Sequence, residues 1–177
     1  KFIVNIPRKG GEMKKKKSNT KSVILNGVAL LLSALTMIFY ACAHYTGKAG
    51  SLTGSKNGFE TIQEMFDVSN KASATVAGIM ILIVFITAAI VFLLAVVNML
   101  GALGVIKNVR VLRAINMLTS WILALAGIIG VICLAVYLKD ISVLSIEYKN
   151  GWANIINMIL AIGTCTVVTL DYLTTRK

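Results

Sequence analysis

Charged residues are scarce in this sequence, and the few that occur are gathered in short stretches. They make up 14% of the 177 residues, whereas a soluble domain carries about 25%. Proline and histidine occur only once each. Apolar residues account for 57% of the chain and the mean hydropathy is +0.82, so the composition excludes a water-soluble globular or disordered protein. It predicts an integral membrane protein.

Four apolar blocks contain no Asp, Glu, Lys, Arg or His. They cover residues 23–43, 74–104, 114–138 and 151–170. A helix needs about 20 apolar residues to cross the hydrocarbon core of a bilayer, and lipid offers no partners to exposed backbone groups. The sequence therefore predicts an all-α membrane protein, a four-helix transmembrane bundle over residues 23–170. A basic segment 1–22 precedes it and a tail 171–177 follows it.

The absence of ionisable residues from these blocks bears on function. A charged side chain at the centre of a membrane costs about 2.5–3.5 kcal/mol or more, so such residues usually mark proton relays, ion paths or catalytic sites. Their absence argues against a proton-coupled transporter, an intramembrane protease or a charge-lined channel. A passive pore or a carrier built from amides and carbonyls stays open.

Basic residues gather on one side of the predicted membrane. Four spans place both termini on the same side as the loop between spans two and three. From Met13 onward that side has one carboxylate, Asp171, against ten cations: Lys14, Lys15, Lys16, Lys17, Lys21, Lys107, Arg110, Arg113, Arg176 and Lys177. The positive-inside rule therefore predicts cytoplasmic termini in a cell membrane. The net charge of +11 is explained by topology, and no nucleic-acid partner is expected, since no base-reading motif accompanies it.

The first methionine, Met13, stands between Lys-Gly-Gly-Glu and four lysines. Residues 9–13 back-translate into a purine-rich bacterial ribosome-binding site followed by a start codon. We expect translation of a bacterial gene to start at Met13, with residues 1–12 an upstream extension; the alternative is a flexible basic tail. The stretch that follows resembles a secretory signal, but its apolar run is long for one, which favours an uncleaved first span.

The three cysteines and the single histidine lack the neighbouring residues that a redox or metal site requires. Cys42, Cys133 and Cys165 form no Cys-x-x-Cys pair, so small packing residues are favoured over a thiol redox site. A meeting of Cys42 with Cys133 at the outer surface stays open, because sequence does not give their distance. His44 has no neighbouring ligand set and is expected to be an interfacial polar residue. No catalytic residue, cofactor or metal site is predicted.

Small residues and amides suggest how the spans pack. Ala126 with Gly130, and Ala161 with Cys165, are small-xxx-small pairs that let helices approach closely, either inside the bundle or at an oligomer face. Asn154 and Asn157 lie three residues apart on one helix face. We expect them to be modest interhelical glue, with a small polar vestibule as the alternative.

The first outer loop divides into two halves. Residues 46–58 are glycine-spaced and are expected to be flexible. Phe59, Ile62 and Phe66 then recur at helical spacing among acidic residues, and Asn57 with Glu60 fits a capping box. A short amphipathic helix is predicted there. It serves either as a lid over the helix ends or as a docking surface for a membrane-protein partner through Phe59, Ile62 and Phe66.

The loop between spans two and three carries Lys107, Arg110 and Arg113 at steps of three, with apolar residues on another face. A short helix of this kind would rest on the anionic lipid headgroups of the inner leaflet, at about 1 kcal/mol for each basic residue.

The lysine-rich start, the first span and the glycine-spaced loop with Gly58-Phe59 resemble the small, uncharacterised four-span membrane proteins of low-GC Gram-positive bacteria. The order of spans with a larger first outer loop is also similar to that of claudins and tetraspanins, but their cysteine patterns are missing. These resemblances imply layout alone. We expect a non-enzymatic accessory or scaffold protein; the alternatives are a homo-oligomeric transporter or channel subunit and, third, a membrane thiol oxidoreductase.

Overall fold

A computed structural model of the chain describes residues 19–67, 72–142 and 146–175. The elements follow in the order α1 (Thr20–Phe39), β1 (Ala43–Ala49), β2 (Leu52–Asn57), α2 (Gly58–Asp67), α3 (Ala72–Ala102), α4 (Arg110–Ile141), β3 (Glu147–Asn150) and α5 (Trp152–Thr175). The expected extension 1–12, the start at Met13, the lysines at 14–17 and the last two basic residues, Arg176 and Lys177, lie outside the described residues.

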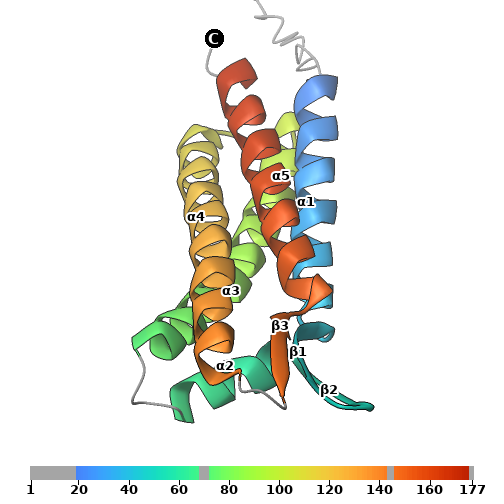
Figure 1. The fold of residues 1–177 in the computed structure, drawn as a ribbon. Helices are drawn as coiled ribbons and strands as arrows, with labels where there is room; N and C mark the ends of the chain where they lie inside the picture. Colours follow the sequence, from blue (N-terminus) through green and yellow to red (C-terminus); the bar gives the residue numbers. More distant parts are fainter. Residues whose placement is uncertain (1–18, 68–71, 143–145, 176–177) are drawn as a thin grey trace, which may run out of the picture.

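The helices α1, α3, α4 and α5 are each long and apolar enough to cross a membrane. They coincide with the four predicted spans, although their ends differ from the prediction by a few residues. They pack side by side, with α3 and α5 each contacting both α1 and α4 (Figure 1). The start of α1 and the end of α5 lie together at what we call the terminal end, and the three strands and α2 lie at the opposite sheet end.

Small and polar side chains fill the space between the four long helices. Ala88, Ala95, Ser33 and Thr36 are among the fully buried residues, and the hydroxyls bond back to carbonyls one turn earlier, as Ser33 does to Ala29. Large apolar side chains cover the outside, with exposed fractions of 43–63% at the following positions: Leu31, Ile38, Leu93, Trp121, Leu125, Ile132, Ile159 and Ile162. Helices that associate in lipid show this distribution, because small residues allow close approach and lipid is as apolar as leucine.

The predicted small-residue pairs lie inside the chain. Ala126, Gly130, Ala161 and Cys165 are all buried. A Cβ added at Gly127 would come 3.5 Å from Ala161 Cβ, so α4 and α5 approach closely here. Gly130 instead lies against Met80 and Ile81 of α3, so these small residues allow close approach of α4 to both neighbours inside one chain.

A small sheet corrects the all-α prediction and the expected flexibility of residues 46–58. β1 pairs with β2 in an antiparallel hairpin, and β1 also pairs with β3 from the last loop, which gives the order β2-β1-β3. Gly50, with φ +59, supplies the left-handed backbone of the hairpin turn. The prediction failed because β3 is about 100 residues away in the sequence, and no apolar alternation marks either strand of the hairpin.

The expected short helix over Lys107, Arg110 and Arg113 does not form as a separate element. Residues 103–109 make an irregular turn, and α4 begins at Arg110. Gly104 and Asn108 have φ values of +86 and +61, which a continuous helix does not allow. The turn lets α3 and α4 reverse direction within a few residues, with Gly101 lying against Val109.

Candidate functional site at the sheet end

The helix α2 begins with the predicted capping box, which the structure confirms. The Asn57 side chain accepts a hydrogen bond from the Glu60 backbone N–H at 3.0 Å, and the Glu60 carboxylate accepts one from the Asn57 N–H at 2.9 Å. Thr61 and Met65 are buried, and Met65 packs against Gly78 of α3. The cap and this buried face fix which side of α2 faces away from α3.

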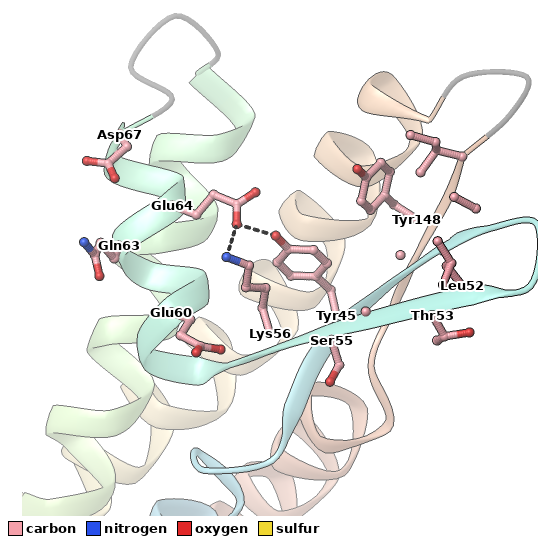
Figure 2. Close-up of a pocket in the computed structure, with 14 residues that line it drawn as sticks. Tyr45, Leu52, Thr53, Ser55, Lys56, Glu60, Gln63, Glu64, Asp67 and Tyr148 are labelled. Carbon is pink, nitrogen blue, oxygen red and sulfur yellow. Dashed lines mark hydrogen bonds and ion pairs between the residues drawn. The ribbon is translucent and has the colours of Figure 1, made fainter.

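An open cavity of about 910 Å³ lies between α2 and the sheet (Figure 2). Two parts of the chain line it: the β1–β2 hairpin with the exposed side of α2 that follows it, and Ile146 with Tyr148 from the last loop. The charged side chains in its lining are Lys56, Glu60, Glu64 and Asp67. Volumes of this size hold small organic ligands or short peptide segments.

Glu64 joins α2 to both strands of the hairpin. Its Oε2 accepts a hydrogen bond from the Tyr45 hydroxyl at 2.5 Å and lies 3.5 Å from Lys56 Nζ (Figure 2). Tyr45 is 4% exposed. Burial, and then the hydrogen bond to Glu64, raise the pKa of the Tyr45 hydroxyl above its usual 10.0, so it stays a donor at neutral pH. Glu64 is thereby held in place before any ligand arrives.

Two tyrosines form an aromatic wall of the pocket. The rings of Tyr45 and Tyr148 lie 6.3 Å apart in an edge-to-face arrangement. Tyr148 covers Gly47, since a Cβ there would lie 2.7 Å from the ring. This wall therefore requires glycine at position 47. The sequence suggested that Gly47 belongs to a flexible stretch, whereas the structure gives it a role in packing.

The predicted docking residues Phe59, Ile62 and Phe66 are not on the pocket side of α2. Ile62 packs against the core, whereas Phe59 and Phe66 are 53% and 43% exposed. The Phe59 ring also contacts Tyr40 and Phe85, with centroids 5.6 and 5.3 Å away. Phe59 therefore anchors α2 to α1 and α3, and part of its ring faces outward.

His44 lies just past the end of α1, in β1, and is buried inside the protein at 1% exposure. The Nδ1 of its ring lies 3.1 Å from the Cys42 carbonyl oxygen. Because a carbonyl can only accept, Nδ1 carries the proton and donates this hydrogen bond. Nε2 lies 3.5 Å from Asn157 Nδ2. Burial lowers the pKa of the His44 imidazole, against a smaller opposing effect of the Cys42 carbonyl. Asn157 shares a small internal cavity with His44, Tyr40 and Asn154. Cys42, Cys133 and Cys165 are free thiols.

A second polar cluster lies at the terminal end and was missed by sequence reasoning. Asp171 is 3% exposed within α5, accepts a hydrogen bond from Ser22 of α1, and lies 3.8 Å from Arg113 Nε of α4. Asn26 donates to the Ser22 carbonyl and lies beside its hydroxyl. The sequence did contain a signal for this ion pair. Arg113 and Asp171 have opposite charges, and each lies one residue outside a predicted span, on the same predicted side of the membrane.

The three residues that were predicted to contact lipid headgroups therefore differ in their surroundings. Lys107 and Arg110 are exposed at the terminal end, whereas the Arg113 side chain is 14% exposed and turned toward Asp171. No group of three His, Cys, Asp or Glu residues within the described ranges is placed to hold a metal ion.

Comparison of the chain with protein-family models, with curated proteins and with solved structures gives no match. Its function must be inferred from its own residues.

Proposed function

We propose that the chain is a multi-pass protein of a bacterial cell membrane, in which α1, α3, α4 and α5 form a four-span bundle. The support is the distribution of side chains. Polar groups such as Asn98 and Asn116 are buried between the helices, and large apolar side chains cover the outside. In water, this arrangement would expose a continuous apolar surface.

The proposed orientation puts the terminal end in the cytoplasm and the sheet end outside. Lys21, Lys107 and Arg110 are exposed at the terminal end, in keeping with the positive-inside rule. Lys107 and Arg110 contact anionic lipid headgroups in this orientation, whereas Arg113 belongs to the pair with Asp171.

Its role is that of a non-enzymatic accessory protein that binds a partner through the sheet end. The observation that carries this proposal is the pocket beside α2, which the first loop, from the hairpin through α2, and the distant last loop build together. The bond between Tyr45 and Glu64 and the contact of Gly47 with Tyr148 fix its walls. A fixed shape of this kind outside the membrane favours binding of a partner, because a preformed site lowers the ordering cost of association.

Site-specific photo-crosslinking in the native membrane tests this function. Benzoylphenylalanine at Thr53, on the pocket rim, is expected to capture one defined protein, whereas the same group at lipid-facing Ile162 is not. The Thr53 adduct should weaken when Asp67→Asn is added. Absence of any Thr53-specific adduct would contradict the proposal, and an adduct only to a second copy of the chain would replace it with the homo-oligomer alternative.

A further inference from the structure

The pocket's lining indicates which chemistry it accepts. We propose that it binds an extended organic polycation, with two or more alkylammonium or guanidinium groups, along the stripe Glu60, Glu64 and Asp67. This inference deepens the proposed function and rests on it for the physiological source of the ligand. The source is either a free polyamine or a basic segment of a partner protein.

The first argument is charge. Three carboxylates line the cavity against one cation, Lys56, whose ammonium group is already paired with Glu64. Asp67 makes no ion pair within the part of the chain that the structure describes. Within an open cavity that low-dielectric walls partly enclose, such an excess of one sign attracts the opposite charge.

The second argument is the placement of these carboxylates on α2. Residues i, i+4 and i+7 share one helix face, so Glu60, Glu64 and Asp67 repel one another there. Asp67 is also the last residue of α2, where the helix dipole already carries partial negative charge, and the last turn has no basic residue. Both features cost stability, and a bound cation would relieve both. A local rule broken in this way is typical of functional sites.

The third argument concerns shape. At about 1.5 Å of rise per residue, the stripe from Glu60 to Asp67 extends over roughly 10 Å. Carboxylates strung out in this way do not converge on one ion, and no described group of three is placed to hold a metal. A linear ligand with several positive charges matches the length of the stripe, and the cavity of about 910 Å³ has room for it.

The fourth argument is the aromatic wall. Alkylammonium and guanidinium groups bind favourably over the faces of tyrosine rings, and their hydrocarbon stems pack on the same surface. Both tyrosines line the cavity across from α2 (Figure 2), but Tyr45 is only 4% exposed, so the half-buried Tyr148 supplies the ring surface that a ligand can reach. A simple inorganic cation would have no use for this wall, whereas an organic cation contacts the wall and the stripe together.

Binding of two probes to the full chain in phosphatidylcholine nanodiscs tests the inference. The probes are spermine and a lysine-rich peptide, measured by isothermal titration calorimetry at low and high salt. Glu64→Gln combined with Asp67→Asn should weaken binding about tenfold. The matched control is Asp140→Asn, which removes the same type of charge from an exposed site at the sheet end outside the pocket. The control should bind like the parent, and affinity should fall as salt rises.

The aromatic wall is tested separately with Tyr148→Leu against Tyr148→Phe. The phenylalanine variant should keep the affinity of the parent, and the leucine variant should lose several-fold. Thermal unfolding curves matching the parent show that each variant is folded. Binding of neither probe, or equal loss in the pocket double variant and in Asp140→Asn, would overturn the inference.

The two proposals fail differently. If neither polycation binds but the Thr53 crosslink to a partner persists, the accessory function stands and the ligand chemistry is wrong. If spermine or the peptide binds with the expected dependence on Glu64 and Asp67 while no partner is captured, the site stands and the accessory function is wrong.

Discussion

The hydroxyl of Ser22 lies 2.5 Å from Asp171 Oδ1, which joins the first and the last membrane-length helix at the terminal end. Arg113 of α4 approaches both groups, with its Nη2 3.3 Å from the Ser22 hydroxyl and its Nε 3.8 Å from the carboxylate. Three helices therefore meet at one carboxylate, and its negative charge balances a guanidinium that is largely withdrawn from solvent.

Removal of the carboxylate by Asp171→Ala should destabilise the protein by about 3 kcal/mol, because breaking a buried pair leaves an uncompensated charge. The double variant Asp171→Leu with Arg113→Met should recover most of this loss, since an apolar replacement of both partners needs no compensation. Denaturant titration in detergent, followed by circular dichroism, measures both. Equal stability of Asp171→Ala and the parent would show that Arg113 does not depend on this carboxylate.

How much of this structure follows from sequence depends on the range of the interactions. The four long helices follow from local composition, and the capping box of Asn57 and Glu60 is encoded within four residues. The sheet depends on β1 meeting β3, and the pocket depends on Tyr148 closing over Gly47. A glycine-spaced stretch carries no local signal for a partner strand from another loop. The burial of His44 and Asp171 likewise follows from packing between helices and loops that are distant in sequence.

The junction where α1 meets the sheet depends on two glycines. A Cβ at Gly151 would overlap the Ala43 carbonyl oxygen, and one at Gly58 would lie 2.6 Å from the Tyr40 ring. Gly151→Ala should therefore cost about 3 kcal/mol or more, since the clash is with backbone, and Gly58→Ala somewhat less. The matched control is Gly54→Ala in β2, where a Cβ meets nothing within 4 Å. Thermal unfolding compares the three variants, and a Gly151→Ala protein as stable as Gly54→Ala would contradict the packing at this junction.

The N-terminus of α2 should weaken when its cap is removed. Asn57→Ala deletes the acceptor for the Glu60 N–H and should cost about 1 kcal/mol. Hydrogen exchange should then speed up in the first turn of α2 without changing in α4. Asn57→Asp, which keeps an acceptor oxygen, is the control and should exchange like the parent. Unchanged exchange in the alanine variant would mean that the contact of Phe59 with Tyr40 and Phe85 suffices to hold the helix start.

Acidification should destabilise the sheet end through His44. The folded protein holds this imidazole neutral, with a pKa below the ordinary 6.5, so the unfolded chain binds a proton more readily than the folded one. The free energy of unfolding should therefore fall as the pH drops below about 6.5, by up to about 1.4 kcal/mol per pH unit, until the folded imidazole itself is protonated. Stability measured from pH 7.5 to pH 5 checks this slope.

The control is His44→Gln, which has no group that titrates in this range. Its unfolding free energy should be lower than that of the parent at pH 7.5 and nearly level down to pH 5.5, so the two curves should converge on acidification. Parallel curves would assign the acid sensitivity to other groups. Convergence would show that the contact of His44 with Asn157 depends on a neutral ring, because a protonated Nε2 cannot accept from the Asn157 amide, whereas Nδ1 donates to the Cys42 carbonyl in either form.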